Sequence, residues 1–369
     1  MTVDFLIAIT IFQTVLMAVV VSGLFIGHST ALRRDRLRET ELALVRDAVR
    51  RFLAHRLLAE ETIEILDDVS VGSLNIYVHE FAAQTSGSQG DTIFQLLRST
   101  RWHQRVLRHA TSRFWWRRLG AARAIASIAR AEHLLVIHRL LNDATPATRL
   151  AAASALERLP SPALASAILD RAICGHAVVR NHLIEVLAAS QTIVLPVLIE
   201  RLRDPSGDDE LRVLLDLGAL LGYPTLLQHV VPHANSPAVE VRVAAATCLR
   251  NFPHPQSSNA LRRMLTDRSW QVRARAAASL GAVSAAEAID DLKLSLCDPN
   301  WWVRLRSAIA LRLVGPAGIE ELKRVDGRID RYAFDMARYV LELDDGAMAE
   351  YVGGSATDFA TAPSGALAS

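Results

Sequence analysis

The sequence predicts an all-α protein: an α-solenoid of helical hairpins preceded by one transmembrane helix. Three observations lead to this fold class. The 369-residue chain is 51% hydrophobic and rich in Ala and Leu, a composition that favours helices. It carries a regular internal repeat, and it begins with a long stretch that has no charge.

The uncharged stretch FLIAITIFQTVLMAVVVSGLFIG covers residues 5–27. As a helix it would extend about 34 Å, which is enough to cross the hydrocarbon core of a bilayer. The preceding residues, MTVD, contain no base, and this argues against a cleaved signal peptide. We therefore expect residues 1–28 to form a transmembrane anchor.

The charges around this stretch predict its orientation. No basic residue precedes it, and seven arginines follow it closely: Arg33, Arg34, Arg36, Arg38, Arg46, Arg50 and Arg51. Positive charge stays on the cytoplasmic side of a membrane, so the amino terminus is expected outside and the rest of the chain in the cytoplasm. The abundance of Ala and the near absence of Lys are typical of a GC-rich bacterium, which makes the bacterial inner membrane the predicted location.

Two flanking regions are predicted from their composition. Residues 29–112 are expected to form juxtamembrane helices and an amino-terminal cap, with residues 29–69 as one amphipathic helix. Residues 345–369 lack the apolar density of a folded segment and are expected to be disordered.

Between these regions an arginine recurs at nearly constant spacing. The positions are Arg118, Arg149, Arg180, Arg212, Arg242, Arg273 and Arg304. A fixed period of roughly 31 residues indicates a solenoid in which each unit stacks on its neighbours. Small or apolar residues dominate three and seven positions after each arginine, on one helical face, and a second apolar segment precedes each turn. Residues 113–344 are thus predicted to be a series of helical hairpins.

The turn of the hairpin has its own pattern. Asp143, Asp267 and Asp298 each lie six residues before an arginine, where a short carboxylate caps the second helix. An arginine on an apolar face needs a partner. We expect each guanidinium to reach the turn carboxylate of a neighbouring unit and so form a structural ladder.

The segments DRSWQVRARAAASL and DPNWWVRLRSAIAL, and less fully SPAVEVRVAAATCL, resemble the HEAT repeat, in particular the short version seen in phycobilisome lyases. The resemblance implies that the Asp and Arg are structural and that the second helices line a concave surface for partners. The Asp column instead holds Cys174, Ser206 and Ser236 in the middle units, so the ladder is expected to be broken or weakened there.

Motifs of catalysis are missing from the sequence. There is no GxxxxGK[ST], GxSxG or GxGxxG motif. His229 and His233 lie four residues apart, but Pro232 interrupts the helix that would direct both to one metal. Cys174, Cys248 and Cys297 lack metal or redox spacing and are expected to be reduced thiols in a packed interior. We expect no enzymatic activity, no cofactor and no metal.

One segment departs from the overall balance of 41 basic and 39 acidic residues. Between residues 98 and 130 there is no acid, and bases alternate with aromatic residues; the patch comprises Arg98, Arg101, Trp102, Arg105, Arg108, Trp115 and Trp116. Such a pattern binds nucleic acid or anionic lipid. The alternative is a cap whose tryptophans seal the end of the solenoid.

The outward side of the second helices is the other predicted binding site. Apolar or basic residues at expected exposed positions mark a protein contact: Leu214, Leu217, Leu221, Arg275, Arg306, Ile309 and Leu313. Asp216 would fall on the buried face of its helix, so a shift of the repeat register by two near DPSGDDE would bury Leu214 and Leu217 instead.

These predictions combine into a membrane-anchored cytoplasmic adaptor that holds a partner protein at the membrane. The expected partner is a membrane enzyme or transporter, for example an exopolysaccharide glycosyltransferase. Two alternatives belong to other classes: an enzyme similar to a chromophore lyase, and binding of nucleic acid or anionic lipid through residues 98–130.

Overall fold

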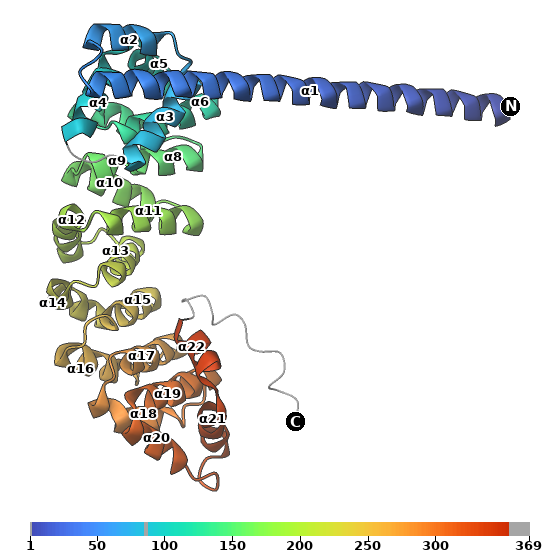
Figure 1. Ribbon diagram of the computed structural model, residues 1–369. Helices are drawn as coiled ribbons and strands as arrows, with labels where there is room; N and C mark the ends of the chain where they lie inside the picture. Colours follow the sequence, from blue (N-terminus) through green and yellow to red (C-terminus); the bar gives the residue numbers. More distant parts are fainter. Residues whose placement is uncertain (1, 85–87, 354–369) are drawn as a thin grey trace. The chain divides into compact units, whose positions relative to one another are not determined.

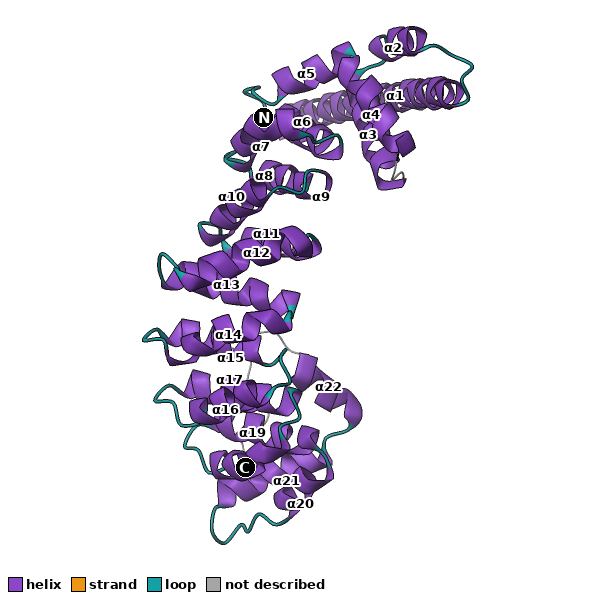
Figure 2. Ribbon diagram, turned by 90° about the vertical axis from the view of Figure 1, so that its left-hand side faces the viewer, coloured by secondary structure: helices purple, strands orange, loops and turns teal. Residues whose placement is uncertain are grey.

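The computed structural model describes residues 2–84 and 88–353. Within the first helix it describes the side chains of residues 13, 14, 16, 17, 19–22, 25 and those from Arg33 onwards. The regular structure of these residues is helical throughout, without strands (Figure 2). The chain divides into two compact units, Met1–Leu159 and Pro160–Ser369, each with its own buried core.

The first unit begins with one long helix and three shorter ones. They are α1 (Thr2–Leu53), α2 (Ala59–Asp67), α3 (Val71–Gln84) and α4 (Ser88–Ser99) (Figure 1). The carboxyl-terminal part of α1 packs on α2 and α3 and buries Val45, Ala48 and Val49. The described side chains of α1 before residue 41 are exposed.

The prediction of one helix over residues 29–69 is wrong, because the chain reverses between α1 and α2. His55 has a φ of 52°, in the left-handed region that a right-handed helix does not accommodate. Helix α2 begins four residues later and buries Thr62 and Leu66. The residues predicted as one helix therefore form two that pack on each other.

Two hairpins complete the first unit. The first pairs α5 (Arg101–His109) with α6 (Trp115–Ser127). The second joins η1 (Ala131–His133) and α7 (Leu134–Leu141) to α8 (Pro146–Ala153) and α9 (Ala155–Arg158). The second helices of the two hairpins, α6 and α8, pack on each other. Helices α6 and α8, which lie one repeat period apart in the sequence, are therefore neighbours in the fold.

The second unit continues the same hairpins. Its elements are α10 (Pro162–Ile173), α11 (Ala177–Ala189), α12 (Gln191–Arg203), α13 (Asp208–Leu221), η2 (Pro224–Leu226), α14 (Leu227–Val230), η3 (Val231–Asn235), α15 (Val239–Leu249), α16 (Pro255–Met264), α17 (Trp270–Ala282), η4 (Ala286–Ala288), α18 (Ile289–Ser295), α19 (Trp301–Val314), α20 (Pro316–Lys323), α21 (Arg331–Glu342) and α22 (Asp345–Gly353). Helices α11, α13, α15, α17, α19 and α21 are the second helices, and each packs on the next.

Small residues bring the second helices of this unit close together. Gly281 of α17 faces α19 so closely that a Cβ atom there would lie 2.8 Å from the Cα of Ala310. Ala276, Ala277 and Ala308 are fully buried in the same region. Close helix contact of this kind excludes solvent from positions that would be open on an isolated hairpin.

The predicted disordered tail begins with structure. Residues 345–353 form α22, which lies alongside α17 and α19 (Figures 1 and 2). The Nη1 atom of Arg306 donates to the carbonyl oxygen of Tyr351 at 2.5 Å, and the hydroxyl groups of Tyr339 and Tyr351 are 2.8 Å apart. Residues 354–369 of the predicted tail lie outside the described residues.

In the part of the chain that the structure describes, no single helix is long and apolar enough to cross a bilayer. Helices α11 and α12 reach the required length and hydropathy only as a pair, and the chain bends by 116° between them. Most side chains of the predicted anchor, residues 5–27, lie outside the described set.

Candidate protein-binding surface

The repeating arginine forms the same set of contacts at three positions. Arg118 pairs with Asp143, Arg242 with Asp267 at 2.7 Å, and Arg273 with Asp298 at 2.6 Å. In each pair the guanidinium makes two parallel hydrogen bonds to a carboxylate 25 residues later. The predicted arginine–aspartate ladder is thus present at these three positions, and we call each such pair a complete rung.

Each arginine also closes its own turn. Arg273 Nη1 donates to the carbonyl oxygen of Asp267 at 2.8 Å, six residues earlier. The carboxylate at the other end caps the next turn, since Asp298 Oδ1 accepts from the backbone N–H of Asn300 at 2.8 Å. One pair of side chains therefore joins two turns and satisfies backbone groups that would otherwise have no partner.

The middle of the ladder lacks these rungs, as the sequence predicts. Arg149 and Arg180 donate to carbonyl oxygens of their own turns. The Nε atom of Arg212 is buried and has no hydrogen-bond partner. A serine or cysteine in the Asp column offers no charge to a guanidinium, so Arg149 and Arg180 keep the turn contact alone.

A different arginine joins the hairpins of this region. Arg201 on α12 pairs with Asp170 of α10 at 2.7 Å, and its Nε atom donates to Glu210 of α13 at 2.6 Å. Glu210 also accepts from the backbone N–H of Ser206 at 2.8 Å. Sequence analysis missed this group, although Asp170 and Arg201 are separated by one repeat period.

Most residues predicted to form the concave contact surface are buried. The exposed fractions are 0% for Leu214 and Leu217, 8% for Leu221 and 2% for Ile309. The prediction that these leucines and Ile309 are exposed is wrong. Leu214 and Leu217 face the core, but so does Leu215 three residues after Arg212, so their burial does not require the shifted register; Asp216 is half-buried.

The charged members of the same set are also covered. Arg275 and Arg306 are 7% and 9% exposed, and Leu313 is half-buried. Helix α22 covers Arg306 by accepting its hydrogen bond through Tyr351. Packing of successive second helices, with α22 beside them, removes the open face that a single hairpin would present.

The predicted basic and aromatic patch does not form one surface. Trp102 is 1% exposed, and its Nε1 atom donates to Asn75 Oδ1 at 2.9 Å. Arg101 is exposed and pairs with Asp67 at 3.5 Å, whereas the Arg98 side chain is largely buried. Arg105 is half-buried and Arg108 is exposed.

Two tryptophans of the patch remain on the surface. Trp115 and Trp116, at the start of α6, are 50% and 54% exposed. Trp116 stacks on Phe114 with ring centroids 4.7 Å apart, and the guanidinium groups of Arg113 and Arg117 lie 4.6 and 5.2 Å from the Phe114 centroid. We call residues 113–117 the aromatic–arginine cluster.

The position of this cluster follows from the ladder. Residues 113 and 114 belong to the turn before α6, and Arg118 fixes that turn through bonds to the carbonyl oxygens of Ser112 and Arg113. The two tryptophans are thus presented at a helix start whose backbone is held in place. An exposed pair of indoles beside a phenylalanine ring that two guanidinium groups face has the composition of a protein-binding hot spot.

The remaining candidates are metal-binding side chains and the three cysteines. Within the described ranges, no three His, Cys, Asp or Glu side chains come together to hold a metal ion. Cys248 is buried, but Cys174 and Cys297 are exposed, so the prediction that all three lie in the interior is wrong. Both are on turns between hairpin helices, where sequence spacing gives no sign of burial.

The fold and the ladder define a stacked α-solenoid of the class built from repeated helical hairpins. The family model for HEAT repeats matches residues 101–188, 195–271, 224–312 and 262–325, which together span more than half of the chain. The chain belongs to the HEAT-repeat family. No curated protein matches it.

Solved structures of the karyopherin Kap121p are similar in fold. The complex of Kap121p with the SUMO protease Ulp1p matches with a TM-score of 0.54 and 12% identity, covering 83% of this chain and 41% of the karyopherin. The complex with Nup53p matches with a TM-score of 0.53 and 12% identity, covering 78% and 38%. This chain spans less than half the length of these karyopherins, and at such identity the similarity concerns the fold alone.

Proposed function

We propose that this HEAT-repeat protein is a non-catalytic scaffold that binds a partner protein through the aromatic–arginine cluster. The observation that carries the proposal is the exposure of Trp115 and Trp116 at the start of α6, next to a turn fixed by Arg118. Large aromatic side chains are normally buried, and adjacent exposed ones mark interaction sites. Burying the exposed half of each indole would contribute roughly 2 kcal/mol to binding.

The composition of the cluster indicates which chemical groups the partner surface would carry. Tryptophan and arginine are enriched where binding energy concentrates, and guanidinium groups on an aromatic face are oriented before the partner arrives. A complementary surface would offer an apolar pocket for the indoles and carboxylates for Arg113 and Arg117. Kap121p binds the SUMO protease Ulp1p and Nup53p in its solved complexes, and we propose that this chain likewise binds a protein.

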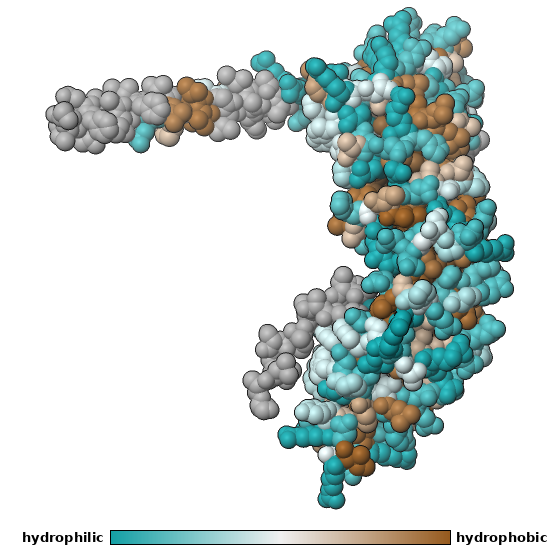
Figure 3. All heavy atoms as spheres, turned by 180° about the vertical axis from the view of Figure 1, so that it is seen from behind, coloured by the Kyte–Doolittle hydropathy of each residue, from teal (hydrophilic) through white to brown (hydrophobic). Residues whose placement is uncertain are grey.

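We further propose that α1 tethers the scaffold to a membrane. Its described side chains include Leu16, Met17, Val19, Val20, Val21 and Phe25, all more than half exposed. In Figure 3 hydrophobic side chains of α1 appear without a cover of protein atoms. A bilayer is the surrounding that such a helix favours, and the arginines from Arg33 onwards would lie at its cytoplasmic face.

The tether favours a partner that is itself in the membrane, and we propose an enzyme or transporter of the bacterial inner membrane. An exopolysaccharide glycosyltransferase is one member of this class. In segment 98–130, Trp102 is buried and the Arg98 side chain is 13% exposed, so the segment does not present its basic and aromatic residues as one continuous track for nucleic acid.

Deletion of residues 1–28 tests the tether. We expect the full chain to remain in the membrane fraction after alkaline carbonate extraction, and the truncated chain to be released into the supernatant. Release of the full chain by carbonate would refute the tether, but it would not bear on the proposed binding surface.

Replacement of both tryptophans by alanine tests the binding surface. Chains carrying W115A and W116A should lose the protein that cross-links to wild type in intact cells, while thermal unfolding stays unchanged because both residues are half exposed. Leu135→Ala is the matched control, because Leu135 is 84% exposed on α7 and outside the cluster. Equal cross-linking by the double variant and by wild type would refute the proposal.

A further inference from the structure

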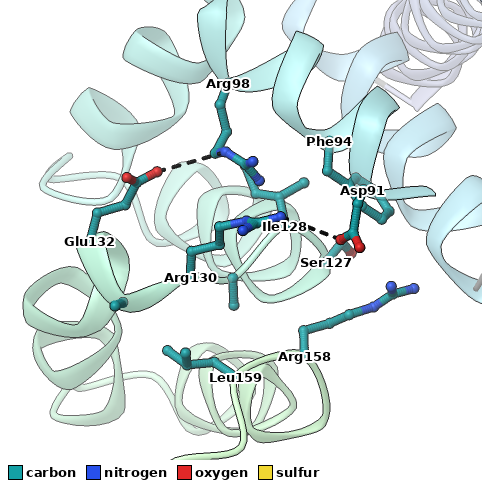
Figure 4. Close-up of a pocket in the computed structure, with 11 residues that line it drawn as sticks. Asp91, Phe94, Arg98, Ser127, Ile128, Arg130, Glu132, Arg158 and Leu159 are labelled. Atoms are coloured by element: carbon teal, nitrogen blue, oxygen red, sulfur yellow. Dashed lines mark hydrogen bonds and ion pairs between the residues drawn. The ribbon is translucent and has the colours of Figure 1, made fainter. Parts of the chain in front are cut away.

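Arginines of this fold face carboxylates at several sites. The three complete rungs are one example. A pocket beside α4 is another, because Arg98 lies 3.8 Å from Glu132 and Arg130 lies 3.3 Å from Asp91 (Figure 4). Arg304 of α19, the last arginine of the ladder, departs from this pattern.

Arg304 makes only half of a rung. Its Nη1 atom donates to the carbonyl oxygens of Asp298 at 2.8 Å and Pro299 at 3.2 Å, so it closes its own turn. In the complete rungs the Nε and Nη2 atoms bind a carboxylate 25 residues later. The corresponding residue here is Ile329, and the buried Nε atom of Arg304 has no hydrogen-bond partner among the described residues.

The neighbouring acid does not replace the missing carboxylate. Asp330 accepts a hydrogen bond from the backbone N–H of Ala333 at 3.0 Å and so caps α21. It also accepts from the thiol of Cys297, and it attracts Arg304 only from beyond ion-pair distance. The Arg304 guanidinium lies instead 5.3 Å from the centroid of the Tyr332 ring. The side of the guanidinium that binds a carboxylate in the complete rungs thus has none bound in the described part of the chain.

The turn between α20 and α21 exposes large apolar side chains. Ile329 and Tyr332 are 86% and 70% exposed. They lie where the stack of the second unit ends (Figure 1). The last repeat of a solenoid normally presents a polar outer face to water. Large apolar side chains exposed at this end therefore indicate a contact surface.

The same turn carries a carboxylate that faces no cation. Asp326 is exposed, and in the described ranges it forms no ion pair. Its Oδ1 atom accepts from the backbone N–H of Arg328 at 2.9 Å, and its carbonyl oxygen accepts from the N–H groups of Ile329 at 3.0 Å and Asp330 at 3.3 Å. These bonds hold the carboxylate in a fixed turn, close in sequence to the residues that surround Arg304.

We propose that two copies of this chain associate through this turn, with Asp326 of each copy binding Arg304 of the other. A two-fold contact brings identical patches together. A patch that carries both a guanidinium without a bound carboxylate and a carboxylate without a cation is complementary to itself. The carboxylate would take the place that Asp298 occupies in the rung of Arg273.

The apolar side chains would complete the interface. Ile329 would be covered by the second copy, and Tyr332, which is largely exposed, would turn to admit the carboxylate. The proposal goes beyond the scaffold function and does not depend on it. The turn belongs to the second unit, whereas the aromatic–arginine cluster and α1 belong to the first.

Sedimentation velocity of the purified full chain in a density-matched non-ionic detergent tests the contact. We expect wild type to be dimeric and D326R to be monomeric, because the substitution places like charges opposite each other at both sites of the contact. D326N, which only removes the charge, should raise the dimer dissociation constant about tenfold, because two ion pairs are lost at once. Glu185→Arg is the matched control, since it makes the same change of charge on an exposed side chain of α11 in the same unit, and it should stay dimeric.

Mixing two variants gives a second test. R304E alone should be monomeric, because two acidic side chains then oppose each other. An equimolar mixture of R304E and D326R should form dimers, because opposite charges meet again at both sites. If R304E does not fold, D326R and E185R still decide the matter, because both side chains are exposed in the wild type.

Three results would overturn the proposal. The first is a wild type that stays monomeric, as expected if a different protein covers the turn. The second is a dimer that survives D326R, as a dimer held by α1 would, or one that E185R disrupts equally. The third is a mixture of folded R304E and D326R that stays monomeric.

Discussion

Each complete rung of the ladder joins side chains whose charges are mostly shielded from water. Asp143 and Arg118 have side chains that are 7% and 19% exposed. A carboxylate in such a place is stable because it accepts two guanidinium hydrogen bonds and one from the backbone N–H of Thr145. The pair therefore stabilises the stack mainly because each buried charge has the other as its partner.

Asp143→Asn should lower the free energy of unfolding by about 2 kcal/mol at pH 7, the magnitude typical of hydrogen bonds to a charged group. The hydrogen bond from Arg118 is the main cause that lowers the pKa of the Asp143 carboxyl. Its contribution is thus complete above the unfolded pKa of about 4 and is lost as the pH falls through the lower folded value.

Urea unfolding at several pH values measures this effect. The difference between wild type and D143N should shrink below about pH 4. Glu64→Gln, an exposed position on α2, is the control and should change little at either pH. A difference that stays constant down to pH 2 would show that the Asp143 charge does not contribute.

A histidine pair in the first unit gives a second pH dependence. His103 and His133 have Nε2 atoms 2.9 Å apart, and His133 Nδ1 accepts from the backbone N–H of Arg130 at 3.1 Å. Burial, then the neighbouring His103, lowers the pKa of His133 to about 4, against the opposing effect of Glu132. Burial also lowers the pKa of His103.

A lowered folded pKa means that the unfolded chain binds more protons between about pH 4 and 6.5. The first unit should therefore lose stability as the pH falls through this window and keep it above. Nuclear magnetic resonance titration of the His133 ring should give a midpoint of about 4. A midpoint near the ordinary value of 6.5 would contradict the neutral, hydrogen-bonded pair.

At the level of helices, the second helices are the part that the sequence predicts best. The arginine period and the small residues after it mark α6, α8, α11, α13, α15, α17 and α19, because each repeats one local environment. The break at His55 and the helix α22 were not predictable in this way. They occur once, and α22 depends on contacts with residues far away in sequence, such as Arg306.

Gly281→Ala should destabilise the second unit by about 1–3 kcal/mol, the usual cost of overpacking a core. The added methyl would lie 2.8 Å from the Cα of Ala310, which belongs to a helix and cannot yield easily. Gly72→Ala on α3 is the control, because no atom lies within 4 Å of its Cβ position. Thermal unfolding should show a lower midpoint for G281A alone. Equal midpoints would indicate that α17 and α19 are packed less tightly.

At the level of the whole molecule, the sequence predicts a binding scaffold but not the location of its contact surface. Leu214 and Ile309 seemed available because one hairpin leaves them open, and stacking buries them. Trp102 and Trp116 carry the same sequence signal, yet only Trp116 is exposed. Exposure depends on which neighbours cover a side chain, and a single sequence does not state this.

The affinity of the cross-linked partner, once purified, tests the central claim most directly. Isothermal titration against the full chain should show W115A and W116A together weakening the complex about a thousandfold, as expected for two hot-spot residues of about 2 kcal/mol each. The control L135A should keep the affinity of wild type. A double variant that binds as tightly as wild type would contradict the account of this protein as a scaffold that binds through the aromatic–arginine cluster.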